Sequence, residues 1–153
     1  MRKSTLCFLT IFLFLKGFLI ISYARANEIP ENALYVSLEG DDGAGEGTAD
    51  SPFATAERAL KEALPGDTIL VRGGTYNKTR LIVSKQGKPN AWITIKAYPG
   101  EKVIFDGKGA AEREDDLHES RALLPAIIDI KDARYIVIDG FEVTNSGGYG
   151  IAT

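Results

Sequence analysis

The chain contains Val103-Ile104-Phe105-Asp106-Gly107 and, 33 residues later, Ile136-Val137-Ile138-Asp139-Gly140. In both stretches two apolar residues flank a variable one, and an Asp-Gly pair follows. Apolar alternation with a period of two is typical of a β-strand, and Asp-Gly predicts a turn in which the aspartate accepts hydrogen bonds from turn amides. The chain is therefore expected to repeat a unit made of a strand and a turn.

A second series of short β-branched segments supports a repeat. Its members begin at Ile69, Ile93, Ile128 and Ile151, at intervals of 24, 35 and 23 residues, and the long interval contains a polar insertion at about 108–121. Short strands that recur every 20 to 30 residues without a helix between them indicate a solenoid of coiled strands. We predict an all-β fold of about three rungs, in which the four segments stack as one column.

Alternation within each strand predicts which side chains face the shared interior of such a coil. Asn145 ends a strand, where its tolerance of the left-handed conformation suits a tight corner. The expected inward set is Ile69, Val71, Ile93, Ile95, Val103, Phe105, Ile128, Ile130, Ile136, Ile138, Phe141 and Val143.

One amphipathic helix is predicted, at about residues 55–64. Thr55 is suited to cap its N-terminus, and Pro65-Gly66 ends it. The loop before it has four glycines within eight residues, which excludes regular structure there. The apolar stripe of the helix consists of Ala56, Ala59, Leu60, Ala63 and Leu64.

The first 26 residues have the pattern of a secretory signal peptide. Met1-Arg2-Lys3 is basic, Leu6 to Ile21 is almost entirely apolar, and Ala24-Arg25-Ala26 predicts cleavage after Ala26. The alternative is an uncleaved membrane anchor, but 16 helical residues at about 1.5 Å each fall short of a ~30 Å hydrocarbon core. We expect a secreted or periplasmic protein, with residues 27–153 as its mature β-helix portion and no stable membrane anchor.

Cysteine content and net charge limit which disulfides and which binding partners the mature portion can have. The only cysteine, Cys7, lies inside the leader, so the mature portion has no disulfide and depends on its core. Residues 27–153 carry all 21 acids but only 14 bases, a net charge of −7. This balance argues against nucleic-acid binding through phosphate neutralisation. Acidic sugars remain possible partners, because a bound cation can bridge two anions.

Several further stretches carry a family resemblance. They are Tyr35-Val36-Ser37, Gly40-Asp41-Asp42, Gly47-Thr48, Ser51 to Thr55, Pro65 to Tyr76, Ile93 to Gly100 and Tyr135 to Ile151. Together they resemble secreted right-handed parallel β-helix proteins of the pectate lyase superfamily, closest to the N-terminal part of family 9 polysaccharide lyases. The resemblance implies that the helix at 55–64 caps the first rung. It also implies calcium-assisted β-elimination on a uronate polymer, pectate above all.

No catalytic residue or calcium ligand of that family can be transferred to this chain. In the family those groups lie in rungs beyond the matched portion, so we expect them beyond Thr153. The last strand starts only at Gly150-Ile151. The sequence is therefore expected to describe an incomplete solenoid, from a truncated reading frame or a fragment.

Substrate-binding candidates come from the outward positions. If the predicted column stacks, Arg72, Lys96 and Lys131 form a row of bases about 4.8 Å apart, which would suit a polyuronate. The alternative is a solvated strand face balanced by neighbouring aspartates. Trp92 and Tyr135 fall outside the inward set, and flat rings of this kind match the faces of pyranose sugars.

Two acidic clusters are weaker candidates. The loop with Asp41, Asp42, Glu46 and Asp50 could bind calcium, but it lacks the spacing of a calcium loop, which favours a solvated turn instead. His118, in the polar insertion, stands among carboxylates as a surface histidine would. No metal ligand is assigned from the sequence.

Three functions remain open from the sequence. The first is the N-terminal portion of an exported lyase, inactive by itself. The second is a non-catalytic carbohydrate-binding or structural β-helix. The third is a glycoside hydrolase, which needs outward carboxylates about 5 to 10 Å apart, and no such pair is evident. The oligomeric state is not encoded in any visible pattern.

Overall fold

The computed structural model describes residues 29–77, 80–108 and 126–153. The signal peptide predicted at 1–26, and nearly all of the insertion predicted at 108–121 including His118, lie outside the described residues. The chain divides into two compact units, Met1–Glu31 and Asn32–Thr153, and the second contains every strand and the helix that the structure describes. This helix is only seven residues long, so no helix in the described residues can span a bilayer.

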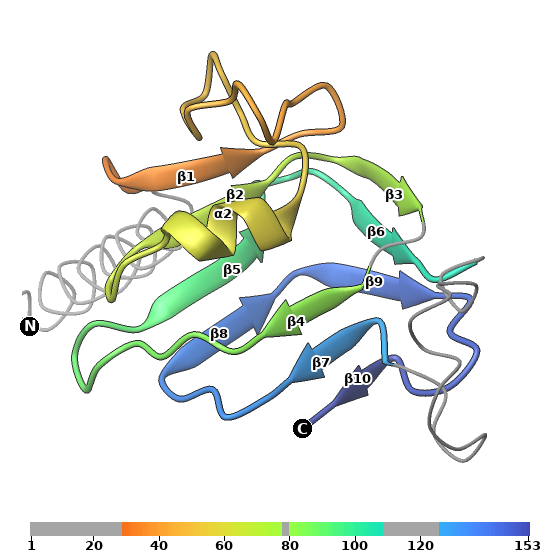
Figure 1. The fold of residues 1–153 in the computed structure, drawn as a ribbon. Helices are drawn as coiled ribbons and strands as arrows, with labels where there is room; N and C mark the ends of the chain where they lie inside the picture. The colour runs from red at the N-terminus through yellow and green to blue at the C-terminus, as the bar shows by residue number, and fades with distance from the viewer. Residues whose placement is uncertain (1–28, 78–79, 109–125) are drawn as a thin grey trace, which may run out of the picture. The chain divides into compact units, whose positions relative to one another are not determined.

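The described residues form ten strands in three sheets, and every neighbouring pair of these strands is parallel (Figure 1). Sheet A consists of β1 (Ala33–Val36), β2 (Thr68–Val71), β5 (Ile93–Ala97) and β8 (Ile136–Asp139); sheet B of β3 (Gly74–Asn77), β6 (Val103–Asp106) and β9 (Phe141–Thr144); and sheet C of β4 (Leu81–Val83), β7 (Ile128–Ile130) and β10 (Ile151–Ala152). The chain visits the sheets in the fixed order A, B, C and then returns to A, so β2–β3–β4, β5–β6–β7 and β8–β9–β10 are three successive rungs. This is a parallel β-helix, as predicted.

The prediction that the segments at Ile69, Ile93, Ile128 and Ile151 stack as one column is wrong, although two neighbouring pairs are confirmed: β2 with β5 in sheet A, and β7 with β10 in sheet C. Ile69 pairs with Ile95 in sheet A, whereas Ile128 lies in sheet C between Leu81 and Ile151. The two Asp-Gly motifs are not equivalent either, because Val103 pairs with Phe141 in sheet B and Ile136 pairs with Ile93 in sheet A. All strands of a rung are short and β-branched, so their spacing along the chain does not reveal which sheet each one joins.

The predicted interior is confirmed. Seven members of the inward set are fully buried, and the other five, Ile130, Ile136, Ile138, Phe141 and Val143, pack against this core while partly buried. Aromatic rings continue the stack through sheet B. Phe105 lies parallel to Phe141 at 4.8 Å between centroids and meets Tyr76 edge to face at 5.8 Å. Three successive rungs therefore share one aromatic column.

The helix α2 (Ala56–Glu62) closes the interior beside the first rung. The Thr55 hydroxyl accepts a hydrogen bond from the Arg58 amide at 3.1 Å, which confirms the predicted N-cap. Ala56, Ala59 and Leu60 are buried in the core, and the helix packs against β1, β2 and β4. In Figure 1 it lies in front of β2, next to the outer edge of β4, an edge that would otherwise be open to pairing.

Polar residues shape the corners between sheets. Asp106 accepts hydrogen bonds from the Lys108 amide and from the Asn145 side chain, both at 2.9 Å, so its predicted role in a turn is confirmed. These bonds, the amide bond first, hold the pKa of the Asp106 carboxyl below its usual range. Asn145 has a φ of 52°, the left-handed conformation expected for it. The hydrogen bond between Asn145 and Asp106 thus links the corners between sheets B and C in two successive rungs.

Candidate functional site

The row of bases predicted from Arg72, Lys96 and Lys131 does not exist. Arg72 follows β2, Lys96 lies within β5 opposite Leu70 and Asp139, and Lys131 follows β7 in sheet C. The error follows from the register, because the sequence spacing placed strands of two different sheets in one column. Lys131 therefore belongs to a different sheet from Arg72 and Lys96, and for Arg72 and Lys96 a role in substrate binding stays a prediction.

Arg72 is held in a structural contact at the corner between sheets A and B. Its guanidinium donates to both carboxylate oxygens of Glu101 at 2.8 to 3.0 Å and lies over the Tyr98 ring at 4.7 Å. The bond from Arg72 holds the pKa of the Glu101 carboxyl below its ordinary value, and the Gly73 amide adds to this effect. The pair fastens the corner of one rung to the corner of the next.

This contact predicts a pH-dependent stability. Because the pKa of Glu101 is depressed in the folded state, its contribution is present above the ordinary glutamate value of about 4.3 and is lost as the pH falls below it. Glu101→Gln should lower the free energy of unfolding by about 0.5–1 kcal/mol at pH 7, a value reduced by the partial exposure of the pair. The free energy of unfolding of Glu101→Gln should also fall less steeply than that of the unmodified protein between about pH 5 and pH 3.

The measurement is urea unfolding of both proteins at several pH values. Glu142→Gln is the matched control, because Glu142 joins Lys102 at 2.8 Å between two more exposed side chains. The difference in free energy of unfolding between the unmodified protein and Glu101→Gln should shrink from pH 7 to pH 3. An equal difference at both pH values would contradict the assignment.

Lys131 belongs to a charge cluster on the outer face of sheet C. The Asp129 carboxylate lies 3.1 Å from the Lys131 ammonium and 3.6 Å from the Arg80 guanidinium. Asp129 is only 14% exposed, whereas the Lys131 side chain is 57% exposed. The Asp129 carboxylate thus contacts both Arg80 and Lys131, and the Lys131 side chain stays open to solvent.

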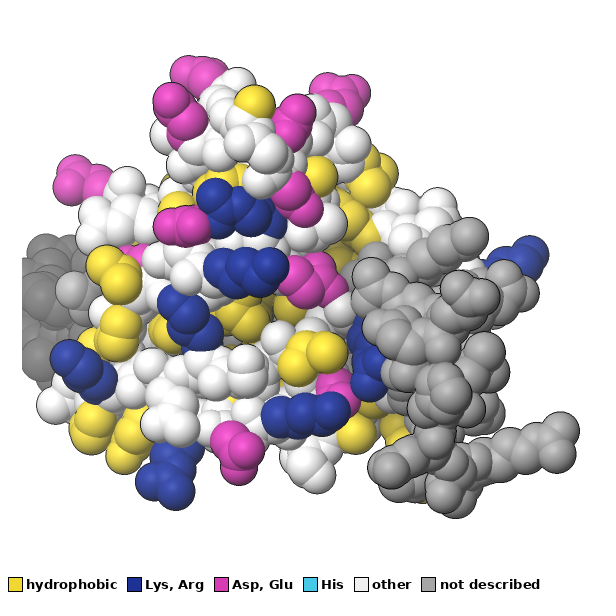
Figure 2. Space-filling model, viewed as in Figure 1, with side chains coloured by type: hydrophobic (Ala, Val, Ile, Leu, Met, Phe, Trp, Pro, Cys, Tyr) yellow, Lys and Arg dark blue, Asp and Glu magenta, His cyan; other side chains and the backbone are white. Residues whose placement is uncertain are grey.

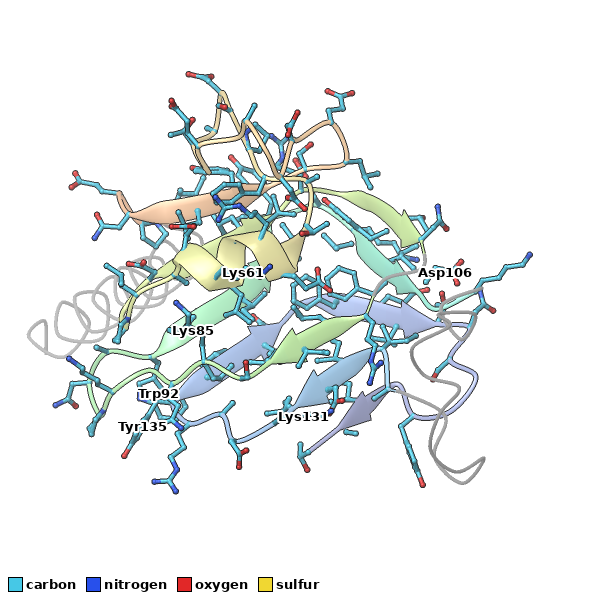
Figure 3. All side chains as sticks on the ribbon, viewed as in Figure 1. Lys61, Lys85, Trp92, Asp106, Lys131 and Tyr135 are labelled. Carbon is cyan, nitrogen blue, oxygen red and sulfur yellow. The ribbon has the colours of Figure 1, made fainter. Side chains whose placement is uncertain are left out.

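Further lysines extend this cluster toward the helix. The Lys85 ammonium donates to the backbone carbonyls of Lys61 and Ala63 at 2.7 and 2.8 Å, which fixes it beneath the C-terminal end of α2. Figure 2 shows dark blue side chains running down the face formed by α2 and sheet C, and Figure 3 labels Lys61, Lys85 and Lys131 along it. We call Lys61, Arg80, Lys85 and Lys131 the cationic face.

A groove of about 660 Å³ lies between α2 and β4, next to the cationic face. Three of the four cations, Lys61, Arg80 and Lys85, line it, and two acids, Asp42 and Glu57, lie on its α2 side. Its charged lining therefore has a small positive excess, and Asn77 and Ser84 add hydrogen-bonding groups. Sequence analysis selected only Lys131 from this surface. The others come from a helix and from both ends of a strand, and only the observed register brings them together.

Trp92 and Tyr135 form an exposed aromatic pair at the corner between sheets C and A. Their rings meet edge to face, with centroids 5.7 Å apart and an interplanar angle of 76°. Trp92 is 49% exposed and Tyr135 is 38% exposed, as predicted from the alternation. Each residue directly precedes a strand of sheet A, and the register of Ile93 with Ile136 brings the two together (Figure 3). Sequence analysis selected both residues but not their contact.

The acidic loop before α2 has a structural role. Asp41 accepts hydrogen bonds from the Gly43 and Ala44 amides, which lower the pKa of its carboxyl, the Ala44 bond contributing most. Asp42 accepts from the amides of Ala54 and Thr55 at 2.8 and 2.9 Å. Within residues 29–77, 80–108 and 126–153, His, Cys, Asp and Glu form no cluster that could hold a metal ion. No calcium ligand is therefore assigned within the described residues.

Three comparisons place the chain among known proteins. Residues 34–153 match the family model described as "Pel9A-like, right handed beta helix region". The chain is 38% identical over 120 residues to pectate lyase PEL9 of Emericella nidulans, which covers 77% of this chain and 29% of that one. It therefore spans less than a third of the length of that relative.

Solved structures confirm the fold. The chain is similar to a GH136 lacto-N-biosidase from Eubacterium ramulus, with a TM-score of 0.62, 24% identity, and coverage of 80% of this chain and 22% of that one. It is also similar to pectate lyase Pel9A, with a TM-score of 0.54, 19% identity, and coverage of 74% and 28%. A lyase and a glycosidase share this architecture, so the fold alone does not select the reaction.

Proposed function

Because the chain belongs to the family of Pel9A-like right-handed β-helix regions, we propose that its protein is a polysaccharide lyase that cleaves a pectate-like uronate polymer by calcium-assisted β-elimination. The observation that carries the proposal is the family match across residues 34–153. The 38% identity to a pectate lyase supports it. The proposal includes export of the protein, since a polymer of this size stays outside the cell and residues 1–26 have the pattern of a signal peptide.

The chemistry explains why cations matter to such an enzyme. In β-elimination a base removes the proton on the carbon next to the uronate carboxylate, the electron pair forms a carbon–carbon double bond, and the glycosidic oxygen leaves and is protonated. Negative charge grows on the carboxylate during proton removal, so fixed positive charges near it lower the barrier. A uronate polymer also carries one carboxylate on each sugar, which favours a positively charged surface for docking.

The cationic face supports this substrate class. Residues 27–153 carry a net charge of −7, yet Lys61, Arg80, Lys85 and Lys131 gather on one face beside a groove. We assign to this face a role in docking an acidic polysaccharide, and not in proton transfer. No catalytic base is assigned within the described residues, and no step is derived through calcium.

The test is an assay of the complete product of the gene with polygalacturonate. We expect ultraviolet absorbance from the unsaturated product to rise when calcium is present, and to stop when a chelator removes it. If reducing ends are released without unsaturated product, the enzyme is a hydrolase and the lyase assignment is wrong. Binding without any cleavage would favour the non-catalytic alternative.

A matched pair of variants tests the docking face. Lys131→Gln should raise KM for polygalacturonate while leaving kcat nearly unchanged, because a docking contact contributes equally to the ground state and the transition state. Lys102→Gln, on the outer side of sheet B, is the control. An unchanged KM for Lys131→Gln would remove this residue from the docking surface.

A further inference from the structure

One residue of the aromatic pair, Tyr135, has a backbone conformation that is unfavourable for a tyrosine. Tyr135 has a φ of 55°, in the left-handed region that bulky residues rarely adopt. At Asn145 the chain places an asparagine at a φ of 52°, a residue that tolerates this conformation. A tyrosine at the same kind of corner costs stability that an asparagine or glycine would not, so the demands of the backbone do not explain its presence.

Neighbouring rungs hold this corner rigidly. The Ile93 amide donates to the Tyr135 carbonyl at 3.1 Å, and the Gly87 amide donates to the Arg134 carbonyl at 2.9 Å. A β-carbon at Gly87 would lie 2.5 Å from the Tyr135 carbonyl oxygen, so the two corners approach closely. The backbone that carries the two exposed rings is therefore held in place, and the rings contact each other edge to face. Little backbone entropy would be lost when a ligand stacks on them.

The two corner segments that carry the pair have a positive excess. Residues 84–92 and 132–135 contain Lys85, Lys88 and Arg134 but only one acid, Asp132. Their net charge is +2, in a mature portion whose net charge is −7. This complementarity favours an anionic ligand over a neutral one of the same shape.

We propose that Trp92 and Tyr135 form a stacking platform for a pyranose ring of an acidic polysaccharide, adjacent to the cationic face. The proposal rests on the proposed function for the kind of polymer, and it assigns a contact to two residues of this chain. A uronate ring has an apolar face that can lie on an aromatic ring, as well as a carboxylate that the corner lysines attract. The platform would hold the polymer without taking part in its cleavage.

The single tryptophan gives a direct readout. Trp92 is the only tryptophan in the 153 residues, so the intrinsic tryptophan fluorescence of this chain reports on the platform alone. Titration with oligogalacturonate should change that fluorescence in a saturable way. Oligogalacturonate with fully methyl-esterified carboxylates has the same rings without the charge, and it should bind about tenfold more weakly. Equal affinity for the two ligands, or saturable binding without a fluorescence change, would overturn the proposal.

Tyr135→Asn separates a binding role from a structural one. Asparagine tolerates the positive φ, so the melting temperature should stay the same or rise, while the affinity for oligogalacturonate should fall about tenfold. Trp92→Ala should weaken binding similarly, as measured by calorimetry. Tyr149→Ala, at a tyrosine that is 58% exposed elsewhere on the surface, should leave affinity unchanged. A destabilised Tyr135→Asn protein with normal affinity would show that the pair is structural.

The two proposals fail in different ways. If the complete gene product lacks lyase activity while oligogalacturonate still quenches or enhances Trp92 fluorescence, the lyase assignment fails and the platform remains. If the lyase is active but Trp92 does not respond to oligogalacturonate, or the chain does not bind it, the platform is wrong and the lyase assignment remains.

Discussion

Replacing Phe105 with alanine is expected to lower the free energy of unfolding by about 3–5 kcal/mol. Phe105 is only 1% exposed and lies between the rings of Phe141 and Tyr76, which belong to the rungs on either side of it. Its loss would leave a cavity in the middle of the aromatic column of sheet B, where parallel strands on both sides restrict collapse. Urea unfolding followed by circular dichroism measures the difference.

Two controls distinguish cavity formation from a general effect on β6. Phe105→Leu keeps most of the buried volume and should cost much less than the alanine variant. Ile104→Ala removes an apolar side chain from the neighbouring outward position, which is only partly buried, and should cost at most about 1 kcal/mol. If Phe105→Ala were no more harmful than Ile104→Ala, the aromatic column would not be a main source of stability.

The coil, its interior and its cap could be predicted because each depends on local pattern. Alternation within a strand determines which residues face inward, whatever sheet the strand joins, so the inward set including Phe105 was correct. The stripe on α2 and the capping hydroxyl of Thr55 are likewise properties of one short segment. These features need no knowledge of which strands are neighbours.

The assignment of strands to sheets could not be predicted, because the corners differ in length. The corner between sheets A and B has two residues after β2 and five after β5, but only Gly140 after β8. The corner between sheets B and C differs most, with three residues between β3 and β4 but 21 between β6 and β7. Matching positions in sheet A are therefore 26 residues apart from Ile69 to Ile95 and 43 apart from Ile95 to Ile138. A search for one constant period joined strands of different sheets.

The candidate site depended on that missing register. Arg72 was expected beside two other cations, but its partner is Glu101, 29 residues along the chain. Lys61, Arg80, Lys85 and Lys131 come from different segments, and no local pattern connects them. Trp92 and Tyr135 could be selected individually, because their position just before a strand indicated exposure, whereas their contact required the pairing of β5 with β8.

Replacing Asp42 with alanine is the second change expected to have a large effect, with a loss of about 2–3 kcal/mol in the free energy of unfolding. One oxygen of the Asp42 carboxylate accepts from the Ala54 and Thr55 amides, and the other accepts from the Thr55 hydroxyl at 2.7 Å. Alanine would leave these partly buried donors without their acceptor at the start of α2. Urea unfolding measures the loss, and hydrogen exchange should show faster exchange of the α2 amides.

Asp41→Ala is the matched control for this prediction. Asp41 is the adjacent acid and also accepts two amide bonds, but these bonds are exposed and stay within its own turn, so its loss should cost much less than the loss of Asp42. Asp42→Asn keeps one acceptor oxygen and should fall between the two variants. Since α2 covers the edge of β4 and forms one wall of the groove, loosening its N-terminus should also weaken oligogalacturonate binding. Equal effects of Asp41→Ala and Asp42→Ala would mean that this loop is only a solvated turn, and that α2 is held in place by its apolar face alone.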